Sequence, residues 1–591
     1  MAVLPGPLAK YSQPIGLALI LTATMLVPAG ASAAITLSVA LGSAGIASLL
    51  AAWTLANTSL PLRHRVALGL TGCAGLVLAY ATLRADSPLI SLYGMTGQHA
   101  GLALWIGAAA WLLASMLAGT RTSLRALIIV TAMSTGFLSA LAVLQQIQGR
   151  VPLWGHTAGA FENSLSLAQL LVLGIASGIA WLVSARSTAS RLLAASALAF
   201  TAAGLLVAQS RAAFLGIAVG VLFTLLTLGA RTSLSRRLLA WGTVTAAALI
   251  TAAIAIASSL RVDASMLTTL NTLGTDRLTI WRSATAAFLQ HPIFGRGLEQ
   301  FSCWVTWGLS DGGLSYGGAY DPHNMVFALL VGGGLAGCTL ALLAFGALLD
   351  AALTSYAEAG SPVLIAVLIG GVVAMGTAAM FAWISPSAFI TAAILLGTVI
   401  AVGTNRAVSE NRVPTRGLKL ILSLSAALAF ALCMGSLTPL RADIDFARLT
   451  RTNSDETAAL MQLSSAWPDP AFAVKASATG TGDPRRFAVV PTVTPRFNRD
   501  RFWHVDLVIQ RLVLDQAVSV SSNRDTWSDF RESVEAGRQA DPSSGVWDVL
   551  GTMEAQRLGK KSEARAYARR ALGYRLGAQE RASMVEQAGV R

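Results

Sequence analysis

Long apolar runs constrain the fold of this chain more than any other feature of its sequence. Thirteen of them approach the roughly 20 residues that a transmembrane α-helix needs. They lie near 13–29, 34–56, 65–83, 99–118, 125–146, 164–184, 191–209, 212–229, 238–258, 323–349, 361–383, 386–404 and 418–437. With a mean hydropathy of +0.61 and only 12% charged residues, the chain is too apolar for a soluble protein. We therefore predict an all-α polytopic membrane protein with about 12–13 transmembrane helices.

The basic residues predict the orientation of these helices. The clusters in alternate short loops are Arg63, His64 and Arg65; Arg121 and Arg125; Arg186 and Arg191; Arg231, Arg236 and Arg237; and Arg406, Arg412, Arg416 and Lys419. Short basic loops stay in the cytoplasm. We expect a cytoplasmic N-terminus and an extracytoplasmic C-terminal part, although the loop near 350–360 has no Lys or Arg. The net charge of +14 then reflects topology, and no nucleic-acid partner is expected.

The same pattern divides the chain into four regions. We expect N-terminal transmembrane helices in 1–258, a large extracytoplasmic loop with an amphipathic helix in 259–322, further transmembrane helices in 323–437, and a soluble extracytoplasmic domain in 438–591. The first apolar run, 13–29, has no convincing cleavage site, so we expect a retained helix. The four cysteines are scattered and suggest neither a metal cluster nor a disulfide framework.

Unusual polar residues gather on the predicted outer face. Arg211 lies in a tight Ser-Arg turn between two apolar runs, Glu162 and Asn163 precede the sixth run, and His323 opens the tenth. Ionisable groups at membrane ends are costly to dehydrate unless they are paired or functional. Each residue alone is best explained as a snorkelling or loop side chain, but their convergence on one face favours a functional site.

Two further segments add polar groups to this face. Residues 276–282, Asp-Arg-Leu-Thr-Ile-Trp-Arg, predict an amphipathic helix that ends at a Pro and Gly turn in 291–297. Arg277 and Trp281 share one side of this helix, whereas Arg282 is turned about 140° away from Arg277. We therefore expect Arg277 and Arg282 to face different partners.

His323 and Asn324 begin a pattern that is more specific. After Asn324 come nine residues, then Gly334, two residues, and Gly337. This spacing resembles the superfamily of O-antigen ligases, O-antigen polymerases and pilin-type O-oligosaccharyltransferases. The ligase pattern is His, then Asn, Ser or Gln, nine residues, Gly, two residues, and Gly, Thr or Tyr. Arg211 and Arg277 fall where family members carry arginines, and Pro292, Gly295, Gly297 and Phe301 look like the family's Pro-x-x-Gly-x-Gly signature.

The chain departs from many family members at two positions. They carry Gln and Glu within the His-Asn helix, where this chain has Ala328 and Gly332. This chain therefore has no carboxylate at that position of the helix. The resemblance covers 150–345 well and the outer helices only by hydropathy. It implies a GT-C-like fold in the inner membrane of a bacterium.

The resemblance also implies a mechanism. Family members take a glycan from undecaprenyl pyrophosphate and transfer it to an acceptor hydroxyl on a glycolipid, a glycan or a protein. Arg211 and Arg277 are the candidates for stabilising the pyrophosphate, His323 for the general base, and Asn324 for orienting His323 or the acceptor. Possible substrate-binding residues of second rank are Arg282, Arg296 and His156. We expect no cofactor and no metal.

The segment directly before His323 is rich in glycine and carries Tyr316 and Tyr320. Aromatic rings stack on sugars and glycines permit movement, so 311–321 is either a lid that orders around the glycan or a linker.

The C-terminal region contains a repeat-like pattern near 525–591. Trp547, Leu550 and Gly551, followed by Ala564, Ala568 and Ala571, resemble a tetratricopeptide unit, although Glu554 replaces the usual Tyr and the closing Pro is missing. Such helix pairs offer a groove to a protein or stack on a neighbouring domain. The extension therefore favours a protein acceptor or an assembly partner.

Several alternatives stay open. An O-antigen ligase is slightly favoured over an O-antigen or exopolysaccharide polymerase, and a protein O-oligosaccharyltransferase is third. A polysaccharide transporter or flippase would need charged residues in the middle of its spans, which this chain nearly lacks. A membrane scaffold would leave Arg211, Arg277 and His323 without a purpose.

Overall fold

The computed structural model describes most of the membrane region and short parts of the C-terminal region. The described residues are 5–26, 31–54, 61–95, 98–149, 161, 163–259, 277–301, 309–310, 313–314, 321–358, 361–404, 415–452, 467, 531, 534–535, 538, 546–573 and 578–589. The predicted site residues His156, Tyr316 and Tyr320 lie outside them, as does the side chain of Arg282. The first half of the C-terminal extension also lies mostly outside.

The described elements are helices, apart from one short ribbon. In chain order they are α1 Pro5–Leu26, α2 Ser32–Thr54, α3 Leu62–Leu83, α4 Pro88–Tyr93, α5 Leu102–Ala118, α6 Arg121–Ile147, α7 Ser164–Ser184, α8 Thr188–Ala208, α9 Arg211–Gly229, α10 Ser233–Ser259, α12 Arg277–Gln290, β1 Leu309–Ser310, β2 Gly313–Leu314, α13 Met325–Glu358, α14 Pro362–Ala379, α15 Pro386–Thr404, α16 Thr415–Thr452, α22 Val546–Arg557, α23 Lys561–Ala571 and α24 Ala578–Ala588.

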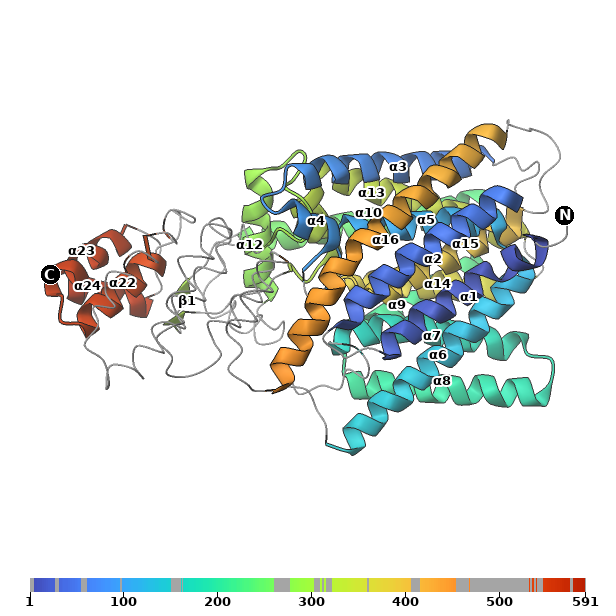
Figure 1. Ribbon diagram of the computed structural model, residues 1–591, viewed down its shortest axis with the longest axis horizontal. Coiled ribbons are helices and arrows are strands. Elements are labelled where there is room, and N and C mark those ends of the chain that lie inside the picture. Colours follow the sequence, from blue (N-terminus) through green and yellow to red (C-terminus); the bar gives the residue numbers. More distant parts are fainter. Residues whose placement is uncertain are drawn as a thin grey trace.

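The all-α polytopic prediction is confirmed. Among the described residues, 11 helices are long and apolar enough to cross a membrane. Two of the thirteen predicted spans are not among these 11. One is α5, which has only 17 residues, and the other is α1. Figure 1 shows these helices running alongside one another in one bundle, with α4 and α12 near the same end.

Small residues let the membrane helices approach closely. α9 and α14 pack along Gly216 and Gly220, where an added Cβ would lie 2.4 Å from the Ala374 carbonyl oxygen and 2.6 Å from the Ala374 Cβ, respectively. Such small-residue interfaces are the usual means of helix association in lipid, where apolar burial alone gives no preference for protein over lipid tails.

α16 is longer than the sequence predicted. The expected span ended at 437, but the helix continues through Pro439 to Thr452. In this continuation, Asp443 is fully buried and its Oδ2 lies 2.7 Å from Nε2 of the equally buried His99. The continuation of α16 is therefore joined to the loop between α4 and α5 rather than separated from the membrane domain at 437.

The described C-terminal helices pack on one another. Gly551 of α22 lies against the ring of Tyr567 of α23, and Arg570 Nε contacts Asp548 Oδ1 at 2.9 Å. Ala564, Ala568 and Ala571 are buried, as their spacing in the sequence suggests. A helical C-terminal part is thus present, while its relation to a tetratricopeptide unit stays a prediction.

The segment before α13 contains a small departure from an all-helical fold. α12 forms where the amphipathic helix was predicted and ends just before Pro292. β1 and β2 pair antiparallel, with Leu309 opposite Leu314. Only its second strand, β2, lies within 311–321, the segment that the sequence suggested as either a lid or a linker.

Candidate active site

The helix that follows His323 is broken in the membrane region. α13 contains a non-helical residue, Gly334, with φ 63° and ψ −168°. A break of this kind leaves carbonyl groups on one side and N–H groups on the other without intrahelical partners. In a low-dielectric environment each of these groups needs another partner.

The loop after α12 supplies those partners. The N–H of Gly297 donates to the Gly332 carbonyl at 2.8 Å, and that of Arg296 donates to the Val331 carbonyl at 3.2 Å. In the other direction, the N–H of Leu335 donates to the Pro292 carbonyl at 2.7 Å, and that of Ala336 donates to the Ile293 carbonyl at 3.0 Å. The Pro-x-x-Gly-x-Gly segment and the glycine-rich helix are therefore two halves of one structure.

Glycine is required at this junction for steric reasons. Gly295 has φ +63°, and a Cβ there would lie 2.5 Å from the Gly332 carbonyl carbon. A Cβ at Gly334 would lie 2.4 Å from the Ile293 carbonyl carbon. Only glycine permits both the left-handed backbone and this approach.

His323 and Asn324 precede the helix rather than forming its first turn, which corrects the span predicted to begin at 323. His323 has φ 49°, and its N–H donates to Asp321 Oδ1 at 2.6 Å. Asn324 Oδ1 accepts hydrogen bonds from the N–H groups of Val326, at 2.9 Å, and Phe327, at 3.2 Å. Asn324 is thus the N-cap of α13, a role for which asparagine is strongly preferred.

The imidazole of His323 packs on Trp383, with the ring centroids 5.2 Å apart. Trp383 is fixed by α7, because its Nε1 donates to Ser166 Oγ at 3.0 Å and its carbonyl accepts from Gln169 Nε2 at 2.6 Å. His323 Nδ1 and Asn324 Nδ2 are buried and have no hydrogen-bond partner in the described part of the chain. Any hydrogen-bond partner of these two nitrogens lies outside the described residues.

α12 holds the turn that carries His323. Trp281 Nε1 donates to the Pro322 carbonyl at 3.1 Å, and the Trp281 ring stacks on Phe327 at 6.2 Å with an interplanar angle of 22°. Arg277 lies one turn earlier in α12, and its positive charge acts on His323. Arg277 and Trp281 therefore face the same region, as their spacing predicted.

The pKa shifts of Arg277 and His323 connect the predicted residues. Burial lowers the pKa of Arg277, and the positive charge of Arg211 lowers it further. Burial also lowers the pKa of His323 to about 4, with Arg277 as the second cause. Arg211 is the first residue of α9 and is exposed, while Ser210 caps that helix by accepting from the Ala213 N–H at 3.3 Å. Arg277 therefore interacts electrostatically with both Arg211 and His323, which come from two other segments of the chain.

Arg296 does not join this group. Its Nε donates to His291 Nε2 at 3.2 Å, and its Nη1 donates to the Arg84 carbonyl at 3.2 Å. These contacts fasten the 291–297 loop to the end of α3. The structure therefore gives Arg296 a structural contact rather than a place beside His323.

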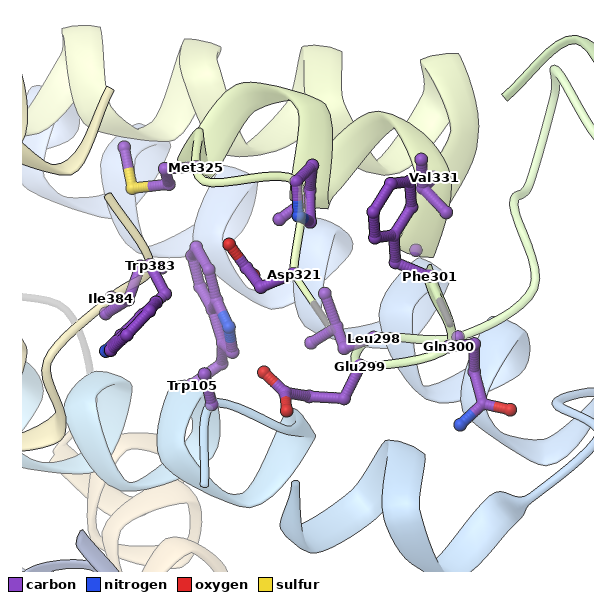
Figure 2. A pocket seen from close by; sticks show the side chains of 15 residues that line it. Trp105, Leu298, Glu299, Gln300, Phe301, Asp321, Met325, Val331, Trp383 and Ile384 are labelled. Carbon is purple, nitrogen blue, oxygen red and sulfur yellow. The ribbon is translucent and has the colours of Figure 1, made fainter. Parts of the chain in front are cut away.

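A cavity opens next to the His323 turn (Figure 2). Its empty volume, counting the part open to solvent, is about 460 Å³. Its lining comes from four loops and from α5 and α13, and includes Trp105, Glu299, Asp321 and Trp383. Burial raises the pKa of Asp321 to about 7, although the N–H of His323 opposes this. Glu299 Oε2 accepts from the Met95 N–H at 3.1 Å.

The sequence analysis missed Asp321, Glu299, Trp105 and Trp383. An Asp two residues before a left-handed position is a signal for an Asx turn, so Asp321 was within reach of sequence reasoning. The other three lie far from His323 in the chain and carry no motif. Ala328 and Gly332, the two departures from the family pattern, also line the cavity.

The fold and site together define a multi-pass membrane protein with a polar, cation-bearing site at one end of its helix bundle. Residues 194–342 match the family described as O-antigen ligase. This match spans about a quarter of the chain and supports the resemblance to the O-antigen ligase superfamily that the motifs predicted. Members of that family are glycosyltransferase-like enzymes. None of the curated proteins compared with the chain matches it. The matched region includes Arg211, Arg277 and His323 but not Trp105 or Trp383.

Proposed function

We propose that this protein transfers a glycan from undecaprenyl pyrophosphate to an acceptor hydroxyl at the extracytoplasmic face of the bacterial inner membrane. One observation carries the proposal: Arg277 is close enough to interact electrostatically with both Arg211 and His323, although Arg211 and His323 lie 112 positions apart in the sequence. Two fixed cations suit a pyrophosphate, and a neutral imidazole suits a hydroxyl proton.

The proposed reaction is a direct displacement. The acceptor oxygen attacks the anomeric carbon, and the bond between that carbon and the pyrophosphate oxygen breaks. The pyrophosphate leaves with the bonding electrons, where Arg211 and Arg277 stabilise its growing negative charge. The hydroxyl proton passes to His323, which later releases it to water. Burial and Arg277 lower the pKa of His323 to about 4, which leaves the imidazole uncharged at pH 7. A bound pyrophosphate would offset the charge of Arg277 and raise this pKa toward the range in which a histidine is an effective base.

Substitution of the two buried groups tests these roles. We expect His323→Ala to lower the transfer rate by about 10²–10⁴-fold and Arg277→Ala by about 10²–10³-fold. Asp350→Asn, a change at the distant end of α13, should leave transfer unchanged. Transfer by both site variants at the wild-type rate, in protein that is inserted and folded, would remove the proposed catalytic assignment.

The acceptor is decided by a cellular experiment. Deleting the gene and analysing surface glycans separates three outcomes. Uncapped lipid A core with intact polymer indicates a ligase, single repeat units indicate a polymerase, and an unglycosylated protein indicates an O-oligosaccharyltransferase. We favour the ligase because residues 194–342 match the O-antigen ligase family.

A further inference from the structure

A buried glutamine of α7 binds the turn between α14 and α15 at two points. Gln169 is 1% exposed and belongs to a helix that is apolar enough to span the membrane. Its Nε2 donates to the Trp383 carbonyl at 2.6 Å, and its Oε1 accepts from the Ser385 N–H at 3.0 Å. Residues 380–385 lie between the two helices, so these backbone groups need partners of this kind in a low-dielectric environment. Gln169 therefore fixes the backbone on both sides of Ile384.

The side chain of Trp383 is attached to the same helix. Ser166 precedes Gln169 by three residues, so both side chains project from one face of α7. Trp383 Nε1 donates to Ser166 Oγ at 3.0 Å, and the indole lines the cavity beside the His323 turn (Figure 2). One hydrogen bond from the ring and one to the carbonyl therefore restrict Trp383 at both ends.

The Trp383 indole is in contact with the proposed base. The rings of His323 and Trp383 are inclined by 34°, and their centroids lie 5.2 Å apart, within the usual range of packed aromatic rings. Within the described part of the chain, the buried His323 Nδ1 has no hydrogen-bond partner that could orient the ring. Packing against Trp383 therefore helps to set the plane of the imidazole, and α7 in turn sets the position of Trp383.

We propose that Gln169 and Trp383 are positioning residues: Gln169 places Trp383, and Trp383 holds the His323 ring where it accepts the proton of the acceptor hydroxyl. This inference rests on the proposed function. Both residues lie outside 194–342, the region that matches the family. The motifs did not indicate the pair, because Gln169 and Trp383 are 214 positions apart in the sequence.

Small displacements of a general base have large effects on rate. The base must lie within about 2.6–3.2 Å of the oxygen whose proton it takes, and a misplacement of about 1 Å can cost about 10²-fold. Gln169→Met keeps the length of the side chain and removes both hydrogen bonds, so we expect kcat to fall about tenfold. KM for the lipid-linked donor should stay near wild type, because Arg211 and Arg277 hold the pyrophosphate in the proposed reaction.

Further variants separate the steps between α7 and His323. Ser166→Ala removes only the acceptor of the indole N–H and should lower kcat less than Gln169→Met does. Trp383→Ala removes the ring and should lower kcat at least as much as Gln169→Met, whereas Trp383→Phe keeps a ring against His323 and should recover most of that loss. Gln13→Met removes a fully buried amide from α1 and is the matched control, with unchanged kcat.

NMR of His323 tests the positioning without relying on transfer. An aromatic ring shifts the signals of protons that lie near its face, so the His323 ring protons report where the Trp383 indole stands. The full chain is studied in nanodiscs with isotope-labelled histidine. We expect the His323 signals to move in Gln169→Met toward their positions in Trp383→Ala, and to stay in place in Gln13→Met.

Three results would overturn the positioning roles. His323 signals that do not move in Trp383→Ala would remove the role of Trp383, and signals that move in Trp383→Ala but not in Gln169→Met would remove that of Gln169. Equal falls in kcat in Gln169→Met and Gln13→Met would show a general loss of packing instead. If the signals move in Gln169→Met while kcat stays at the wild-type value, the contacts are as described and the proposed role of His323 as the base fails.

Discussion

The adjacent residues His323 and Asn324 have different structural positions. His323 precedes the helix in a left-handed conformation, and its buried Nδ1 has no hydrogen-bond partner among the described residues. The Oδ1 of Asn324, by contrast, accepts the hydrogen bonds that cap α13. The sequence predicted the importance of both residues from their spacing to Gly334 and Gly337. The sequence did not show that Asn324 caps the helix while His323 is the proposed base, because a cap can be recognised only when the first residue of the helix is known.

Substitution of Asn324 tests the cap. Asn324→Ala removes the acceptor for two backbone N–H groups and should lower the free energy of unfolding by about 1 kcal/mol. Asn324→Ser retains an acceptor oxygen and should lie close to the wild type. Thermal unfolding in detergent measures both. Equal unfolding temperatures for the Ala and Ser variants would show that the cap contributes nothing.

The histidine pKa yields a prediction with a defined sign. Burial and Arg277 lower the pKa of folded His323 to about 4, against 6.5 when it is exposed. The folded state then binds fewer protons, so His323 lowers stability progressively as pH falls from 6.5 to 4. Arg277→Met should raise the pKa because it removes a positive charge.

Histidine NMR of selectively labelled protein measures this pKa. The His323 signal is assigned by its disappearance in His323→Gln, among the six histidines of the chain. A wild-type pKa near 6.5, or no upward movement in Arg277→Met, would contradict the proximity of Arg277 and His323.

Among the structural elements, the broken helix α13 contributes most to the site. Its break at Gly334 is bridged by four hydrogen bonds to the 292–297 loop. Hydropathy predicted a span here, although not its bounds, because it counts apolar residues whatever their backbone conformation. For the same reason it could not reveal the break, which depends on pairing with a loop that lies about 40 residues earlier in the chain.

Two glycine substitutions test the contact between the 291–297 loop and α13. Gly295→Ala places a methyl group 2.5 Å from the Gly332 carbonyl carbon at a residue with φ +63°, so we expect a loss of about 2 kcal/mol or more. Gly72→Ala in α3 meets no atom within 4 Å and should be neutral or slightly stabilising. Similar unfolding temperatures for the two variants would contradict the packing of the 291–297 loop on α13.

Across the whole molecule, the site depends on contacts between distant parts of the chain. The Met95 N–H contacts Glu299 in the cavity, and four residues later His99 contacts Asp443 of α16. The carbonyl of Tyr93 can only accept, so His99 Nδ1 carries a proton and Nε2 shares another with Asp443. The motifs predicted neither contact, because each joins residues that are more than 200 positions apart.

Removing one member of this buried pair should be costly. His99→Ala leaves Asp443 buried without its partner, and we expect a loss of about 3–5 kcal/mol. The double variant His99→Leu with Asp443→Leu replaces both polar groups by apolar ones and should recover much of that loss. Thermal unfolding of purified protein compares them. A double variant that is no more stable than His99→Ala would contradict this account of the pair.

The central claim is that the Arg211, Arg277 and His323 site transfers a glycan from undecaprenyl pyrophosphate. The most direct measurement follows both products at once in proteoliposomes that contain purified protein, lipid-linked glycan and acceptor. We predict equal amounts of glycosylated acceptor and released undecaprenyl pyrophosphate with wild type and Asp350→Asn, and neither product with His323→Ala. Product formation by His323→Ala at the wild-type rate would contradict the claim. So would a wild-type protein that forms no product when it is tried with each of the three acceptor classes in turn.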